Sequence, residues 1–174
     1  QDIADIGWWR KKITSNRIYW SDHIYEMWGA DSDAGYLDHE QLVEFIHPED
    51  VDRVDRAWQA ALKGESYDIE HRIVTGDGEI KWMREVAEFT YDTDGNPIEA
   101  VGAVQNITGQ KQYEREIKAA RSELREVIDL VPDLIFIKNH DGEYLLANST
   151  IAEYYGLSPD EIEGKREADV LPNP

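Results

Sequence analysis

The order of the predicted secondary-structure elements places the chain in the α+β class. Two short aromatic and β-branched segments open it, at 8–13 and 17–20, and three helical patterns follow. The spacing of apolar residues then changes from about 3.6 to 2 over three strands, at 67–74, 80–91 and 98–107. We therefore expect one α+β domain of about 100 residues whose last three strands form an antiparallel sheet.

Turn and capping residues delimit the three short helices. Ser21 or Asp22 is predicted to cap the first, which ends at Gly29, because their side-chain oxygens accept hydrogen bonds from free amides. Pro48 stops the second helix, and Asp50 is placed to cap the third. The apolar face of the third helix consists of Val51, Val54, Ala57, Trp58, Ala61 and Leu62.

A charge-rich helical segment follows at 110–131, and we call it the exit helix. Its apolar residues are spaced alternately four and three apart, which is the heptad pattern of a coiled coil. These seam residues are Tyr113, Ile117, Ala120, Leu124, Val127 and Val131. Two interpretations stay open: the helix lies against its own domain, or it pairs with a second chain.

The opening pattern returns after Pro132. Aligning Gly156 with Gly29 superimposes a second hairpin and helix on the first, which indicates an internal repeat. Three later strands have no counterpart in this repeat. Residues 132–174 are therefore expected to form the N-terminal part of a second domain.

Composition restricts the partners of the chain. It has 37 Asp and Glu against 18 Lys and Arg, a formal net charge of −19. Because phosphate recognition needs clustered basic side chains, and these are interleaved with acids, we expect no nucleic-acid partner and no membrane contact. The apolar runs are far shorter than the roughly 20 residues that span a bilayer. The acidity fits either ordinary solubility or adaptation to high salt.

The sequence lacks the motifs of enzymes and metal sites. No Cys is present, which excludes disulfides, thiolate metal sites and cysteinyl chromophores. His39-Glu40 is not a zinc HExxH motif, since position 43 is Val43. Asp92 and Asp94 belong to a hairpin turn better than to a calcium loop. We expect neither a catalytic site nor a metal site.

Five segments stand in a characteristic order and spacing: Asn16 to Trp28, Ile46-His47-Pro48-Glu49-Asp50, Tyr67 to Ile73, Gly76 to Trp82, and Gly102 to Thr108. Together they closely resemble a PAS domain with its C-terminal PAC motif. The resemblance covers about residues 5 to 109, and residues 132–174 look like the first half of a second PAS domain. The arrangement resembles the tandem sensory region of histidine kinases and related signal transducers.

The resemblance implies a five-stranded antiparallel sheet with short helices packed on one face and a pocket between them. Aromatic residues at its strand and helix positions could line that pocket, although their spacing also fits a simple core; they are Trp9, Tyr19, Trp28, Phe45, Trp82 and Phe89. His47, Pro48 and Asp50 match the family's structural motif, in which His47 terminates one helix and Asp50 caps the next.

The resemblance also implies a signal relay at Asn106, Ile107 and Thr108, between the last strand and the exit helix. Asn106 stands where the family has Asp, and an amide can accept a hydrogen bond or cap a helix but cannot form an ion pair. We expect the Thr108 hydroxyl to cap the exit helix, while Gly109 permits a change of direction.

These observations together predict a cytoplasmic sensory module, itself not an enzyme, that passes changes to the exit helix and a downstream signalling domain. It would self-associate through that helix. The alternative is a constitutive dimerisation or scaffold module with a filled core. The cofactor is unknown: a cysteinyl flavin is excluded, and haem is disfavoured because the nearest helical candidate, His39, has charged neighbours. The first residue, Gln1, suggests a segment of a longer protein.

The net charge of −19 generates a test of halophily. If carboxylate repulsion limits stability, the melting temperature should rise steeply as salt shortens the Debye length from about 30 Å at 0.01 M to about 3 Å at 1 M. Thermal unfolding from dilute buffer to molar KCl measures this. A flat melting temperature would leave ordinary solubility as the explanation.

Overall fold

A computed structural model describes residues 5–15, 17–31, 37 and 39–171, without the side chain of His39. The chain divides into two compact units, residues 1–112 and 113–174. We describe each unit by itself.

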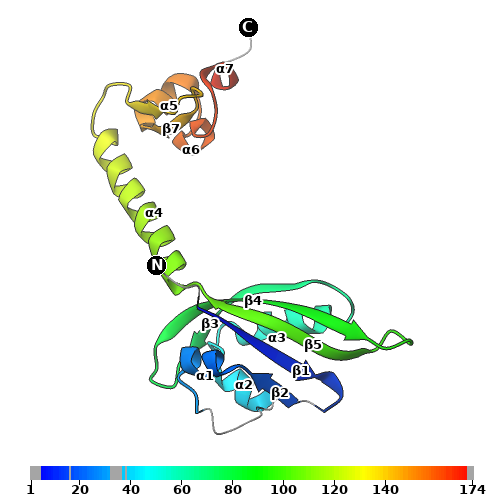
Figure 1. Ribbon diagram of the computed structural model, residues 1–174. Helices are drawn as coiled ribbons and strands as arrows, with labels where there is room; N and C mark the ends of the chain where they lie inside the picture. The colour runs from blue at the N-terminus through cyan, green and yellow to red at the C-terminus, as the bar shows by residue number, and fades with distance from the viewer. Residues whose placement is uncertain (1–4, 16, 32–36, 38, 172–174) are drawn as a thin grey trace. The chain divides into compact units, whose positions relative to one another are not determined.

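The first unit is built on one antiparallel sheet (Figure 1). Its five strands lie in the order β2-β1-β5-β4-β3, and every neighbouring pair is antiparallel. This confirms the predicted α+β fold with a five-stranded sheet. The strands are β1 (Ile6–Lys12), β2 (Arg17–Trp20), β3 (Tyr67–Val74), β4 (Ile80–Tyr91) and β5 (Pro97–Asn106), with a short 3-10 helix, η1 (Ile13–Ser15), between β1 and β2.

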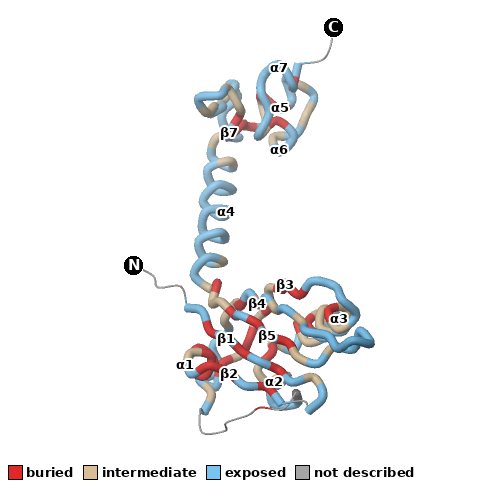
Figure 2. The backbone as a smooth tube through the Cα atoms, turned by 45° about the vertical axis from the view of Figure 1, so that its right-hand side comes forward, coloured by how far each residue is buried: buried red, intermediate tan, exposed pale blue. Residues whose placement is uncertain are grey.

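Three short helices pack against one face of this sheet: α1 (Asp22–Trp28), α2 (His39–Phe45) and α3 (Val51–Ala61). Strand residues alternate between buried and exposed, so the core lies between this face and the helices (Figure 2). Trp9 of β1 is central to it and lies opposite Gly102 of β5. A Cβ atom at Gly102 would lie 2.5 Å from the indole ring, so only glycine lets this ring lie against the sheet.

Two predicted helix caps are wrong in their chemistry. Ser21 occupies the N-cap position of α1, but its hydroxyl oxygen accepts a hydrogen bond from the Trp8 amide of β1, at 3.1 Å. Asp50 occupies the N-cap position of α3 without a side-chain cap, because its carboxylate binds Arg72 of β3. Both oxygens of the Asp50 carboxylate accept hydrogen bonds from Arg72, two of them from the charged guanidinium, so neither oxygen caps the helix.

The Asp50–Arg72 contact, which we call the clamp, attaches the turn between α2 and α3 to the sheet. Asp50 Oδ2 accepts hydrogen bonds from the Arg72 amide at 2.8 Å and from Nε at 3.0 Å, and Oδ1 accepts one from Nη2 at 2.8 Å. The His47 amide donates to the Arg72 carbonyl at 3.0 Å, and His47 Nδ1 accepts from the Glu49 amide at 3.3 Å. The predicted His47-Pro48-Asp50 motif therefore lies in the tightly bound turn.

The helix α4 (Thr108–Asp129) connects the first unit to the second. It begins and ends two residues earlier than the helix predicted at 110–131. Beyond it, a β6-β7 hairpin and α5 reproduce β1, β2 and α1. Gly156 ends α5 at φ 71°, as Gly29 ends α1 at φ 63°, which agrees with the repeat. The elements are β6 (Phe136–Lys138), β7 (Tyr144–Ala147), α5 (Ser149–Tyr155), α6 (Pro159–Ile162) and α7 (Glu167–Val170).

A buried amide side chain holds the second unit together. Asn148 is fully buried, and its Nδ2 donates to the carbonyl oxygens of Ile128, Val131 and Asp133 at 2.8–3.3 Å. Its Oδ1 accepts from the amide of Ile151 in α5 at 3.2 Å. The C-terminal turn of α4 is thus part of this unit's structure, which is how the repeat is stabilised among the described residues.

The clamp predicts that removing the charge of Asp50 destabilises the fold more than removing the charge of Asp68, although both carboxylates bind an arginine. The Asp50 side chain is 7% exposed, whereas Asp68, paired with Arg84 at 2.7 Å, is 46% exposed. Asp50→Asn should lower the free energy of unfolding by roughly 2–3 kcal/mol, and the control Asp68→Asn by less than about 1 kcal/mol. Urea denaturation of both variants measures this, and equal losses would contradict the role of the clamp.

The same pair predicts a pH dependence. Hydrogen bonds from Arg72 hold the pKa of Asp50 well below its usual range. A depressed carboxyl pKa stabilises the fold fully above the unfolded value of about 3.9, and this stabilisation is lost as pH falls through the folded value. The stability gap between wild type and Asp50→Asn should therefore be constant near neutral pH and shrink below about pH 4. A gap that stays constant into strong acid would contradict this assignment.

Candidate functional site

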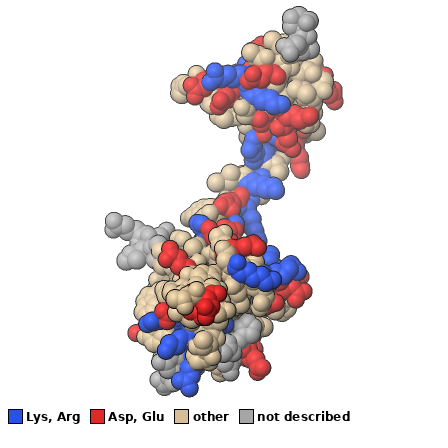
Figure 3. All heavy atoms as spheres, turned by 90° about the vertical axis from the view of Figure 1, so that its right-hand side faces the viewer, with Lys and Arg blue, Asp and Glu red and all other residues tan. Residues whose placement is uncertain are grey.

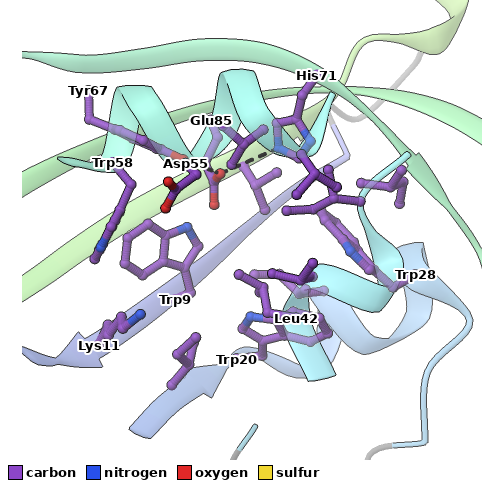
Figure 4. A pocket seen from close by; sticks show the side chains of 18 of the residues that line it. Trp9, Lys11, Trp20, Trp28, Leu42, Asp55, Trp58, Tyr67, His71 and Glu85 are labelled. Carbon is purple, nitrogen blue, oxygen red and sulfur yellow. Dashed lines mark hydrogen bonds and ion pairs between the residues drawn. The ribbon is translucent and has the colours of Figure 1, made fainter. Parts of the chain in front are cut away.

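A cavity of about 210 Å³ lies between the inner face of the sheet and the three helices of the first unit (Figure 4). Most of its wall is apolar, and four indole rings contribute to it: Trp9, Trp20, Trp28 and Trp58. Six polar side chains also line it: Lys11, Asp52, Asp55, Tyr67, His71 and Glu85. The volume is below the roughly 300 Å³ of pockets for drug-sized ligands, so the cavity suits a small one.

Two of the six aromatic residues predicted for the pocket, Trp9 and Trp28, line this cavity. Tyr19 lies on the outer face of the sheet, 41% exposed, with its ring 5.3 Å from that of Trp8. Since side chains alternate along β2, its neighbour Trp20 points inward instead. Sequence analysis could not decide this, because both faces of the hairpin carry aromatic rings.

The other three predicted aromatic residues do not line the cavity. Phe45 packs behind Trp20, with ring centroids 5.9 Å apart, and Phe89 packs against Trp58 at 5.1 Å. Trp82 is half-buried and lies on the opposite side of β4 from the buried Met83. The cations of Arg72 and Lys111 lie 5.7 and 5.6 Å from its ring.

Lys11 is a lining residue that sequence analysis missed. It is 7% exposed, and its Nζ lies 4.7 Å from the centroid of the Trp58 ring. Among the described residues, Nζ has no hydrogen-bond acceptor and no carboxylate at ion-pair distance. Burial lowers the pKa of Lys11. Side chains alternate along β1, so Lys11 lies on the same face as Trp9, and this sequence pattern could have predicted its position.

Three further polar groups of the wall, Tyr67, His71 and Glu85, lie close together. The Tyr67 hydroxyl donates to Glu85 Oε2 at 3.1 Å, and burial together with this carboxylate raises the pKa of Tyr67. His71 is 3% exposed, and its Nε2 lies 3.4 Å from the same oxygen, an ion pair only when the imidazole is protonated. Glu85 therefore has one hydrogen-bond donor, Tyr67, and one neighbour within ion-pair distance, His71.

The predicted relay residues form a compact junction between β4, β5 and α4. The Ile107 amide donates to the Trp82 carbonyl at 2.8 Å, and the Trp82 amide donates to Thr108 Oγ1 at 2.9 Å. Thr108 Oγ1 donates in turn to Asn106 Oδ1 at 2.6 Å, which also accepts from the Thr108 amide at 3.0 Å. The prediction that the Thr108 hydroxyl caps the exit helix is wrong, because Asn106 accepts from the first amide of α4 and the hydroxyl binds β4.

Contacts connect the cavity wall to this junction. Several residues of α3 line the cavity, and Asp50 immediately precedes that helix. Asp50 binds Arg72, whose guanidinium lies beside the Trp82 ring, and the Trp82 backbone binds both Ile107 and Thr108. We call this series the clamp-to-junction network. Sequence analysis missed it because Arg72 is remote from Asp50 along the chain.

The six predicted seam residues are all exposed in the single chain, and five of them lie on α4, whereas Val131 lies beyond its last residue. Tyr113 and Ile117 are each 69% exposed, and α4 has no buried residue. The seam therefore forms an apolar stripe along α4 that the described part of its own unit does not cover.

Charge is mixed over the surface drawn in Figure 3, where Lys and Arg lie among Asp and Glu. Within the described residues no group of three or more potential ligand side chains could hold a metal ion. In the same part of the chain, none of the helices has both the length and the apolar character that crossing a membrane requires. The side chain of His39, the haem candidate, lies outside the described residues.

Comparison with known proteins identifies the fold in both units. A family profile described as the PAS fold matches residues 17–104, and a second profile with the same description matches residues 128–174. The crystal structure of a sensory box histidine kinase/response regulator from Burkholderia thailandensis covers 71% of this chain and 92% of that one, with 27% identity and a TM-score of 0.61. The N-terminal domain of a diguanylate cyclase with PAS/PAC sensor from Marinobacter aquaeolei has 19% identity and a TM-score of 0.56, and the match covers 61% and 98% of the two chains.

Relatives similar in sequence are sensor proteins. Sensor protein FixL of Bradyrhizobium diazoefficiens is 22% identical over 97% of this chain and 34% of its own length. The blue-light-activated histidine kinase of Brucella ovis is 30% identical over 65% of this chain and 22% of its own length. The chain thus spans about a third or less of these relatives. The PAS-fold match over half of the chain, the five-stranded sheet and the sensor relatives lead to one conclusion: the chain belongs to the PAS family of signal-transduction sensor modules.

Proposed function

We propose that this chain is the tandem-PAS sensory segment of a sensor histidine kinase or a related transducer. In this proposal the first unit binds a small ligand and passes the resulting change to α4, and the chain itself has no catalytic role. The clamp-to-junction network is the observation that carries the proposal, because it joins the cavity wall to the first residues of α4. The cavity favours this function over a scaffold module with a filled core.

The mechanism is a shift between two packings of α3 on the sheet. A ligand that contacts Trp58 or Val54 acts on α3, and it favours whichever packing gives it better contacts. Because the clamp fixes the start of α3 to Arg72, a displaced helix moves Arg72 against the Trp82 ring. Trp82 holds Thr108 through its backbone amide, so the displacement changes the direction in which α4 leaves the sheet.

Self-association through α4 would convert that change into an output. The exposed seam has the spacing of a two-stranded coiled coil, and pairing two seams removes apolar surface from water. We therefore propose a dimer of this chain along α4. We also propose a cytoplasmic location and a downstream signalling domain in the parent protein.

The junction predicts that signal transfer to α4 depends on the hydroxyl group of Thr108, which binds the Trp82 amide, and not on its methyl group. Thr108→Val keeps the side-chain shape but removes the hydrogen bond to the Trp82 amide, so the chain should lose about 1 kcal/mol of stability. In the full-length parent the variant should abolish the response to the stimulus, whereas the control Thr108→Ser, which keeps the hydroxyl, should respond. A normal response from Thr108→Val would show that coupling runs through another surface.

If the seam is the dimer interface, a single carboxylate introduced into it should dissociate the dimer. Leu124→Asp places a carboxylate in the apolar contact and should weaken dimerisation by roughly 2–3 kcal/mol. Ser122→Asp adds the same charge to the same stretch of α4 at an exposed position outside the seam and should leave the dimer intact. Sedimentation equilibrium distinguishes the two results, and an unchanged dimer in Leu124→Asp would reject the seam as the interface.

A further inference from the structure

Lys11 is a largely buried residue whose ammonium has no counter-charge among the described residues. The residue is 7% exposed and lines the cavity, and its Nζ has neither an acceptor nor a carboxylate partner among the described residues. Desolvation alone accounts for the lowered pKa of this amine, which agrees with the lack of a nearby anion. A buried charge without a partner is rare in proteins, since desolvating it is unfavourable.

The Trp58 ring does not compensate this charge. Its centroid lies 4.7 Å from Nζ, and a cation–π contact of this kind contributes much less than a buried cation loses by desolvation. A second donor in the same wall is also unpaired, because the indole N–H of Trp9, two residues earlier on β1, has no hydrogen-bond partner in the described part of the chain. Two donors of the lining residues therefore lack an acceptor in the described part of the chain.

The rest of the wall restricts the charge of a ligand. Asp52, Asp55 and Glu85 line the cavity as carboxylates, so a dianion such as a phosphate monoester would meet repulsion. Glu85 lies outside ion-pair distance of Lys11 Nζ, so it does not supply the missing anion. Lys11 is the one Lys or Arg among the described lining residues, so a ligand with a single negative charge matches the cation that the wall offers.

The wall also restricts the shape of a ligand. Four indole rings surround a volume of about 210 Å³, and flat aromatic surfaces pack well against such rings (Figure 4). A ligand with an aromatic body among the tryptophans and an acidic group at Lys11 would occupy both parts of the cavity.

From these observations we propose that the cavity of the first unit binds a small aromatic monocarboxylate, with the carboxylate at Lys11 Nζ and the ring between Trp9, Trp20 and Trp58. The proposal rests on the sensory function proposed above and names its ligand class. Lys11 is the residue that determines specificity for an acid over a neutral analogue of the same shape.

Binding of three matched probes to the full chain tests this proposal. The probes are 2-naphthoate, its neutral amide 2-naphthamide, and the cation 2-naphthylmethylamine, measured by isothermal titration calorimetry. We expect 2-naphthoate to bind at least tenfold more tightly than the other two. This comparison uses wild-type protein and does not depend on any variant folding.

Two adjacent lysines provide matched variants. Lys11→Met should weaken 2-naphthoate binding at least tenfold and leave 2-naphthamide binding within about twofold, because only the charge contact is lost. Lys12→Met removes the same charge from the exposed neighbour and should change neither. The melting temperature of ligand-free Lys11→Met should equal or exceed that of wild type, since an unpaired buried charge has been removed.

The outcomes separate the ligand class from the sensory function. Amide or amine binding as tight as acid binding, or acid binding unaffected by Lys11→Met, overturns the acid specificity and leaves a ligand-binding sensor. No binding by any probe, together with no retained small molecule in native mass spectrometry, overturns both proposals and favours the scaffold alternative.

Discussion

The contact between Asp50 and Arg72 is the constraint on which the first unit depends. It attaches α3 to β3 through a carboxylate that is 7% exposed and three hydrogen bonds of 2.8–3.0 Å. One wall of the cavity is formed by α3, so the same contact sets the distance between that wall and the sheet. Because Arg72 also lies beside Trp82, this stabilising pair is the start of the route to α4.

The cavity and the clamp serve different purposes at the two faces of one sheet. Inward-facing residues of β1 and β3, such as Trp9 and His71, line the cavity, while Arg72 and Trp82 alternate to the other side. Strand alternation thus lets one strand both contact a ligand and carry the effect outward. A ligand shifts a protein between two conformations only if it binds one of them more tightly, and in the proposed mechanism that difference arises at the α3 residues that line the cavity, such as Trp58.

Much of the fold follows from local sequence patterns. The change of period at Tyr67 predicted the strands, and Gly29 and Gly156 marked corresponding helix ends in the two units. The candidate site was less predictable. Whether Tyr19 or Trp20 faces the cavity depends on the face that the helices cover, and local patterns do not determine it.

The predicted caps at Asp50 and Thr108 were wrong for a related reason. Local propensity correctly placed both residues at helix starts, but their side chains bind partners that are distant in sequence, Arg72 and Trp82. Tertiary contacts of this strength override a local cap. Lys11 was predictable in principle, because its position two residues after Trp9 on a strand places it inside.

The central claim is that the clamp and the junction are one coupled network. Native-state hydrogen exchange at the Trp82 amide, which donates to Thr108, tests it most directly when wild type and Asp50→Asn are compared. The account predicts that exchange at Trp82 accelerates more than exchange of amides in the paired centre of β1 and β5, since the junction loosens without global unfolding. If both sets accelerate by the same factor, Asp50 acts only on overall stability and the coupling claim is contradicted.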